Sequence, residues 1–201
     1  SFTSFASFTT ASFTTFTTSI TTTSPTTITA SFPTSITPSF PTTFPTTTFN
    51  DRMTVHLGNR RVDLMHLGRA HTAGDIVIHV PDENVMFTGD IVEDHSACYC
   101  GDGHFADWGT TLDAIKAYDV NSIAPGRGGA LIGKETVNRA IESTRDFVNS
   151  TYAPAARVAA QGGTLKQAWD AVRAECDPKF ADYAIYEHCL PFNVARAYDE
   201  D

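Results

Sequence analysis

Two short loops framed by glycine carry the side chains best suited to bind a metal ion. The first loop is Gly68-Arg-Ala-His-Thr-Ala-Gly-Asp75, and the second is Phe87-Thr-Gly-Asp90. Each loop places one donor, the imidazole of His71 or the carboxylate of Asp90, beside an apolar run typical of a β-strand. Imidazole nitrogen and carboxylate oxygen are the ligands that zinc or iron bind at roughly 2.0 to 2.2 Å. Because glycine lets a ligand loop turn sharply, the pair predicts a metal site.

The wording, order and spacing of the two loops resemble the third and fourth metal motifs of the metallo-β-lactamase superfamily. Those motifs usually read His-Thr-x-Gly-(Asp/His/Ser), followed by a strand that ends in Thr-Gly-Asp. The resemblance implies a zinc cofactor of one or two ions, with iron as the other metal. It also implies that Asp90 bridges two ions and takes part in catalysis, while His71 fixes one ion. We expect Thr72 and Asp75 to hold the first loop and orient the ring.

The fifth metal motif of that family is usually Pro-Gly-His-Gly, but this chain has Pro125-Gly-Arg-Gly128. Arg127 cannot bind a cation because its guanidinium has no free lone pair and stays protonated. Its planar fork of donors suits a substrate carboxylate, and a salt bridge to Asp102 or Asp107 is the other option. Either the second metal site is lost or another side chain fills it. His188 is the candidate replacement ligand, and a packed or surface histidine is equally open.

The other histidines have less specific surroundings. His95 and His104 flank the loop of Cys98 and Cys100, which would border the groove in the resembled fold. We therefore expect His104 to lie on the substrate side. For the histidines at strand positions, a structural role is the default; these are His56, His66 and His79.

The first signature of the resembled family, His-x-His-x-Asp-His, is missing from this sequence, which contains no His-x-His. A catalytic zinc needs three protein ligands and an open position for water. Here one metal ion keeps only His71, and its partner keeps Asp90 with His188 as the candidate. A site with so few ligands lowers the pKa of bound water little. We therefore predict that the chain as given is inactive.

The resemblance implies a metal-dependent hydrolase that acts on a thioester, lactone or amide through a metal-bound hydroxide. Within the superfamily, the chain most resembles the glyoxalase II-like and lactamase-like hydrolases. The expected binding partner is a small-molecule substrate. One alternative is an iron-dependent redox enzyme of the same fold. The other is a non-catalytic product, either a fragment or a decayed relative. Fold alone does not choose between them.

Composition limits the other classes of function. Residues 1–50 contain no charged residue and no histidine, so the net charge of −9 belongs to the segment from Asp51 onward. That acidic segment has no basic stripe, which argues against nucleic-acid binding. No apolar run approaches the roughly 20 residues of a membrane span. The four cysteines form no Cys-x-x-Cys pair, so we expect reduced thiols in a cytoplasmic protein.

The chain is predicted to have two parts. Residues 1–50 are a low-complexity segment of Ser, Thr, Phe and Pro without a lasting period, either genuinely disordered or a mistranslated start. Residues 51–201 number about 150, enough for a single core. We expect this part to be a metallo-β-lactamase-like domain that lacks its N-terminal half.

Hydrophobic patterns predict strands first and helices later. Alternating apolar residues on both sides of Gly58-Asn59 predict a hairpin, and further strands are expected at 76–80, 85–87 and 122–124. One helix is expected to start at Thr110 or Thr111, and another follows a capping box of Thr164 and Gln167. Between them, a helical face is expected over Val137, Ala140, Ile141, Thr144 and Val148. This order favours a layered α/β or α+β domain, which the resemblance identifies as half of an αββα sandwich.

Overall fold

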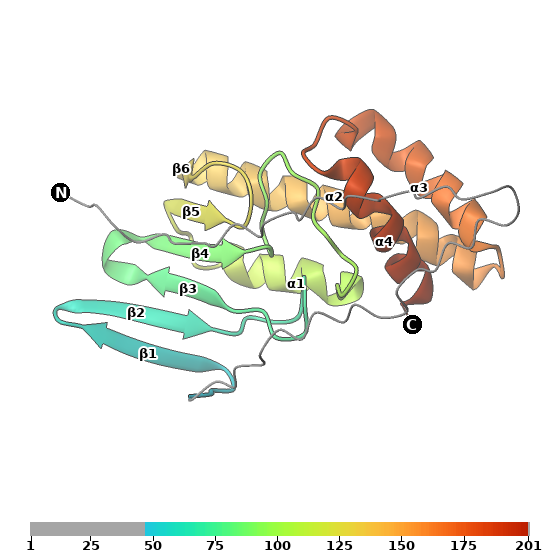
Figure 1. Ribbon diagram of the computed structural model, residues 1–201. Coiled ribbons are helices and arrows are strands. Elements are labelled where there is room, and N and C mark those ends of the chain that lie inside the picture. The colour runs from blue at the N-terminus through green and yellow to red at the C-terminus, as the bar shows by residue number, and fades with distance from the viewer. Residues whose placement is uncertain (1–46, 201) are drawn as a thin grey trace, which may run out of the picture. The chain divides into compact units, whose positions relative to one another are not determined.

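The computed structural model describes residues 47–200, and the predicted low-complexity segment lies outside them except for its last four residues. In the described part the strands are β1 (Arg52–Leu57), β2 (Arg60–Met65), β3 (Val77–Val80), β4 (Val85–Gly89), β5 (Ser122–Pro125) and β6 (Leu131–Ile132) (Figure 1). The helices are α1 (Phe105–Lys116), α2 (Lys134–Ala160), α3 (Leu165–Phe180) and α4 (Tyr186–Asp199). A single 3-10 turn, Pro81–Glu83, joins β3 to β4. The division of the chain at residue 50 stays a prediction.

The predicted hairpin is confirmed. Strands β1 and β2 pair antiparallel, with Val55 opposite Val62. Gly58 adopts a φ of +65° in the turn between them, a conformation that costs glycine no steric strain. The predicted strands β3, β4 and β5 also form, whereas the two-residue strand β6 has no sequence signal strong enough to predict it.

The strand order in the sheet follows the chain, from β1 to β6. Strands β2 and β3 pair antiparallel, as do β3 and β4, while β4 and β5 pair parallel. Strands β2, β4 and β5 therefore run in one direction, and their carboxyl ends meet at the same edge of the sheet (Figure 1). The loops that carry His71, Asp90 and Arg127 leave the sheet at this edge.

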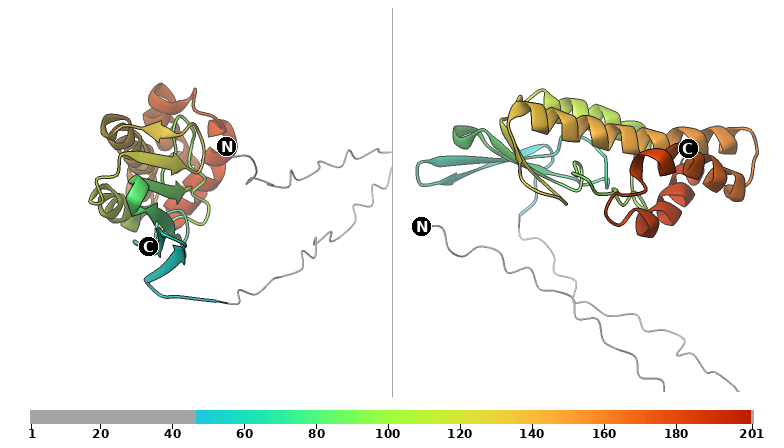
Figure 2. Two further views of the ribbon diagram at one scale, coloured as in Figure 1. Left: turned by 90° about the vertical axis from the view of Figure 1, so that its left-hand side faces the viewer. Right: turned by 90° about the horizontal axis from the view of Figure 1, so that it is seen from above.

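Helices α1 and α2 cover one face of the sheet, as Figure 2 shows. The side chains that point to this face belong to alternate strand positions, and they are almost fully buried: Met65, Val77, Met86 and Ile123. On the opposite face Phe87 is 46% exposed and Ile132 is 72% exposed. The described part thus has one β layer and one α layer, which is half of an αββα sandwich and confirms the predicted fold class.

Helix α1 begins earlier than the sequence pattern predicted. We expected a start at Thr110 or Thr111, but the backbone carbonyl of His104 already accepts hydrogen bonds from the following turn, so that the first helical residue is Phe105. Phe105 and Trp108 lie three positions apart on one helix face and are both buried. Burial of these two aromatic side chains places the start of the helix before Gly109, although glycine has a low helix propensity.

Helices α2 and α3 largely follow the predicted pattern, and α4 does not. The whole predicted apolar face of α2 is buried, and Thr164 and Gln167 form the predicted capping box of α3. Helix α4 was not predicted, and it forms with Pro191 inside it, a residue that normally breaks a helix. It packs against α2 and α3 beside the carboxyl edge of the sheet (Figure 1).

All four cysteines are free and buried, as predicted for reduced thiols. Burial raises the pKa of Cys98 and Cys100 well above the usual range, so both thiols stay protonated. Between residues 47 and 200, no helix combines the length and apolar character that crossing a membrane requires.

Candidate metal centre

The structure brings His71 and Asp90 together at the carboxyl edge of the sheet. The Nε2 atom of His71 lies 3.7 Å from Oδ2 of Asp90. Both side chains are partly buried, with exposed fractions of 20% and 33%. Two ligands of one tetrahedral zinc with bonds near 2.0 Å lie about 3.3 Å apart. The pair is therefore spaced to share one ion, and the role of each residue as a ligand stays a prediction.

Hydrogen bonds within the loop hold the backbone around His71. The backbone N–H and hydroxyl of Thr72 both donate to the carboxylate of Asp75, at 2.9 and 2.6 Å. The Nδ1 atom of His66 lies 2.7 Å from the backbone carbonyl of Asp75. This confirms that Thr72 and Asp75 hold the loop, and it gives His66 a structural role on the same loop.

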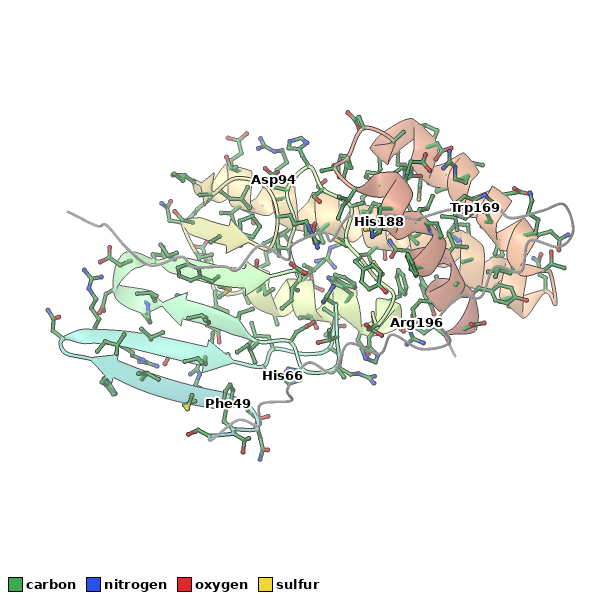
Figure 3. All side chains as sticks on the ribbon, viewed as in Figure 1. Phe49, His66, Asp94, Trp169, His188 and Arg196 are labelled. Atoms are coloured by element: carbon green, nitrogen blue, oxygen red, sulfur yellow. The ribbon has the colours of Figure 1, made fainter. Side chains whose placement is uncertain are left out.

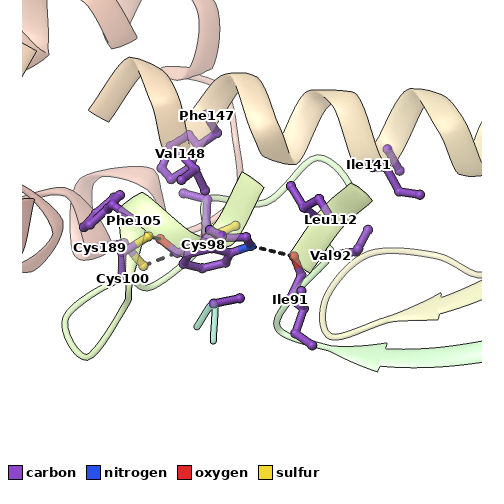
Figure 4. Packing of buried hydrophobic residues seen from close by; sticks show 14 of the residues in the cluster. Ile91, Val92, Cys98, Cys100, Phe105, Leu112, Ile141, Phe147, Val148 and Cys189 are labelled. Atoms are coloured by element: carbon purple, nitrogen blue, oxygen red, sulfur yellow. Dashed lines mark hydrogen bonds between the residues drawn. The ribbon is translucent and has the colours of Figure 1, made fainter. Parts of the chain in front are cut away.

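Aromatic rings, and not Asp75, surround the imidazole of His71. Trp108 packs against it edge to face with ring centroids 6.3 Å apart, and Tyr99 lies at 6.4 Å. The indole N–H of Trp108 also donates to the backbone carbonyl of Ile91 at 3.0 Å, drawn as a dashed line in Figure 4. Because Ile91 directly follows Asp90, Trp108 links the loops that carry both candidate ligands.

The first turns of α1 fix the His71 loop from the other side. The hydroxyl of Thr111 donates to the carbonyl of Arg69 at 2.8 Å, and the backbone N–H of His104 donates to the carbonyl of Ala70 at 2.8 Å. Gly68 is required here, because its φ is +140° and a Cβ atom would collide with the Thr111 hydroxyl. His104 thus positions the loop through its backbone, and its expected place beside the substrate stays a prediction.

Arg127 also reaches Asp90, from the loop that follows β5. Its Nη1 atom lies 3.8 Å from Oδ2 of Asp90 and 2.7 Å from Oε1 of Glu93. The predicted salt bridge to Asp102 or Asp107 is wrong. The parallel pairing of β4 and β5 explains the difference, because it places the loop of Arg127 directly beside the residues that follow β4.

Glycine allows the loops after β4 and β5 to touch. A Cβ atom on Gly126 would overlap the Asp90 carboxylate, and Gly128 has a φ of +95°. The backbone N–H of Gly126 donates to the carbonyl of Val92 at 3.2 Å, and that of Asp94 donates to the carbonyl of Arg127 at 3.2 Å. These two hydrogen bonds fix the position of the Arg127 backbone.

Glu93 is the member of this cluster that the sequence analysis missed. Glu93 is 2% exposed. Its backbone N–H donates to the hydroxyl of Thr144 at 3.2 Å, and that hydroxyl donates to the backbone carbonyl of Glu93 at 3.1 Å. Burial raises the pKa of Glu93 to about 7, although the charge of Arg127 opposes the shift. Burial alone would lower the pKa of Arg127, but Glu93 and Asp90 outweigh it and raise that pKa. A glutamate inside the apolar run that follows Asp90 was the available signal.

His188 does not join this cluster in the structure. It lies exposed in the first turn of α4, labelled in Figure 3, and its ring packs near Phe192 at 6.1 Å. Residues 47–200 gather no group of three or more His, Cys, Asp or Glu side chains suited to a metal ion. His71 and Asp90 therefore fit part of the donor set of one zinc ion, and the role of His188 as a third ligand stays a prediction.

Comparison with known proteins finds hydrolases that share part of this sequence. The metallo-β-lactamase type 2 of Bacteroides fragilis is 30% identical over 115 residues, which cover 55% of this chain and 46% of that enzyme. A linear primary-alkylsulfatase of Pseudomonas sp. (strain ATCC 19151) is 23% identical over 71% of this chain and 28% of its own length. The acyl-coenzyme A thioesterase MBLAC2 of Bos taurus is 36% identical over 52 residues, or 26% of this chain and 18% of that protein. No family model matches the chain.

Among solved structures, the metallo-β-lactamase IND-7 aligns with a TM-score of 0.46 and 25% identity, covering 53% of this chain and 49% of that one. The curated relatives described above confirm the resemblance of the chain to the metallo-β-lactamase superfamily, over about half of its length. The homologues are hydrolases of that superfamily. The chain spans less than half the length of each curated relative described above.

Proposed function

We propose that this chain supplies the His71 and Asp90 side of the active site of a zinc-dependent hydrolase. The observation that carries the proposal is the 3.7 Å approach of His71 Nε2 to Asp90 Oδ2 at the carboxyl edge of the sheet. We propose a thioester, lactone or amide as the substrate. The relatives named as a β-lactamase and as a thioesterase support this class.

Each residue of the cluster has a specific role in this proposal. His71 and Asp90 would hold the zinc ion through imidazole nitrogen and carboxylate oxygen, the donors that zinc prefers. A zinc ion held there would polarise a carbonyl group and activate water. Trp108 restricts the ring of His71 to one orientation by packing against it. Arg127 is 39% exposed, so its outward N–H groups remain able to bind a carboxylate of the substrate.

We further propose that the chain by itself turns over no substrate. A catalytic zinc needs three protein ligands, and the described residues bring two metal-binding side chains together. The missing ligands would have to come from sequence corresponding to the rest of the relatives' length. This observation also favours the second candidate function, a non-catalytic product of a decayed or incomplete gene.

Zinc uptake and hydrolysis together test the proposed function. The purified chain is assayed with a thioester, a lactone and a β-lactam. It is compared with an extended protein, in which the genomic reading frame upstream of Asp51 replaces residues 1–50. We expect hydrolysis from the extended protein with zinc and none from the chain. His71→Ala should abolish that hydrolysis, whereas His56→Ala, which alters an exposed histidine on β1, should not.

Two results would contradict the proposal. One is stoichiometric zinc uptake with turnover by the chain itself. The other is equal hydrolysis by the extended protein and its His71→Ala variant. Elemental analysis of the extended protein decides between zinc and iron, and an iron content of one or more per chain would replace the zinc assignment.

A further inference from the structure

We propose that the guanidinium of Arg127 takes the place of a second metal ion at Asp90, so that this site accepts one ion and not two. The inference rests on the proposed metal site and departs from the expectation that Asp90 bridges two ions. It assigns Glu93 a role as well, as the positioning residue that fixes Arg127 beside Asp90. The argument depends on which groups face one carboxylate oxygen.

A single oxygen of Asp90 faces two different groups. Its Oδ2 atom lies 3.7 Å from Nε2 of His71 and 3.8 Å from Nη1 of Arg127. On the side of His71, a neutral imidazole offers a lone pair to a cation. On the side of Arg127, a permanent positive charge already occupies the position next to the oxygen. A second metal ion on that side would meet a like charge at a separation of a few ångströms.

Glu93 makes the cation of Arg127 a fixed part of the site. The Arg127–Glu93 ion pair measures 2.7 Å, and the side chain of Glu93 is 0% exposed. Among the described residues, Oε2 of Glu93 has no hydrogen-bond partner, and Arg127 is the cation paired with Oε1. A buried carboxylate that lost its only cation would carry a large desolvation penalty. Movement of Arg127 away from Asp90 would therefore leave the buried carboxylate of Glu93 without its ion-pair partner.

Packing and hydrogen bonds of the backbone also fix the loop that carries Arg127. Gly126 leaves room for the Asp90 carboxylate where any Cβ atom would overlap it. Backbone hydrogen bonds on both sides of Arg127 tie its loop to Val92 and Asp94. The loop thus holds the guanidinium against Asp90 by backbone geometry as well as by charge.

Zinc titration of the full chain tests this inference by isothermal calorimetry. The test uses a double variant, Glu93→Gln with Arg127→Met, which removes both charges of the ion pair. Neither remaining side chain is then a buried charge without a partner. Removing a fixed positive charge beside Asp90 should strengthen zinc binding at least about tenfold. The matched control is Glu83→Gln with Arg60→Met, which removes an exposed ion pair between the 3-10 turn and β2. The control should leave the zinc dissociation constant unchanged.

A second pair, Glu93→Gln with Arg127→Gln, repeats the charge removal with a hydrogen-bonding partner, and circular dichroism checks that each variant is folded. Equal zinc affinity of either folded pair and the wild type would overturn the inference. Uptake of two zinc ions by the wild-type chain, both lost in Asp90→Asn, would also overturn it. Hydrolysis is not measured in this experiment, so a failure of the proposed reaction and a failure of this inference are distinguishable.

Discussion

The loops of His71 and Arg127 reach the same oxygen of Asp90 but are held by opposite means. The His71 loop is held by aromatic packing against Trp108 and by hydrogen bonds, two of which run from Thr72 to the partly buried carboxylate of Asp75. The Arg127 loop is held by a buried ion pair with Glu93. Packing and neutral hydrogen bonds depend little on pH, whereas a buried ion pair depends on the protonation of its acid. We therefore expect the stability contributed by the His71 loop to vary little with pH, and that contributed by the Arg127 loop to vary with the charge of Glu93.

The largest effect should come from the packed side. Trp108 is fully buried, packs on His71 and donates a hydrogen bond to Ile91. We expect Trp108→Ala to lower the free energy of unfolding by about 3–5 kcal/mol, as large-to-small changes in a core do. Urea denaturation followed by circular dichroism measures it. Trp169→Ala, at a partly buried position on α3, is the control, and a loss equal to that of Trp108→Ala would contradict the account.

The next effect should come from breaking the ion pair. Arg127→Met leaves Glu93 buried without a cation, which should cost about 2 kcal/mol of unfolding free energy, less than a fully buried pair because Arg127 is partly exposed. The same denaturation experiment measures it. Adding Glu93→Gln should recover part of the loss. Arg60→Met breaks an exposed pair and should cost at most about 0.5 kcal/mol. Equal costs for Arg127→Met and Arg60→Met would show that burial of Glu93 does not matter.

A pH-dependent effect follows from the pKa of Glu93. Burial raises this pKa from its ordinary value of 4.5 to about 7, so the folded chain holds the proton more tightly than the unfolded chain. The stabilisation from this group is therefore complete below pH 4.5 and is lost as pH rises toward 7. Unfolding free energies measured across that range should fall for the wild type and fall less for Glu93→Gln. Parallel pH profiles of the two proteins would contradict the shifted pKa.

The smallest effect should come from a single neutral hydrogen bond on the packed side. Thr111→Val removes the hydroxyl that donates to the carbonyl of Arg69 and keeps the side-chain shape. We expect a loss of about 1 kcal/mol that does not vary with pH. Thr110→Val, one residue earlier and exposed, is the matched control. A strongly pH-dependent loss in Thr111→Val would show that the packed side also responds to charge.

The same contrast explains how much of the site the sequence could predict. The hairpin and strands β3 to β5 followed from local patterns, because alternation and glycine positions are set by neighbouring residues. The meeting of His71 with Asp90 was expected from the resemblance of their two loops to known metal motifs. The partner of Arg127 did not follow. Its choice of Glu93 over Asp102 or Asp107 depends on the parallel pairing of β4 with β5, which joins segments more than 30 residues apart and has no local signature.

Helices show the same limit. The face of α2 and the capping box of α3 are periodic or local features, and both were predicted correctly. The start of α1 depends on burial of Phe105 and Trp108 in the finished core, and α4 forms despite Pro191 because it packs on α2 and α3. Tertiary packing overrides propensity in both cases.

A double-mutant cycle on zinc affinity tests most directly whether His71 and Asp90 converge on one ion. Zinc dissociation constants are measured by calorimetry for the chain, for His71→Ala, for Asp90→Asn and for the double variant. Each single change should weaken binding at least about tenfold, and the double variant should bind little more weakly than either single one, since ligands of a shared ion are strongly coupled. Independent, additive losses, or no loss from one of the two changes, would contradict a shared metal site.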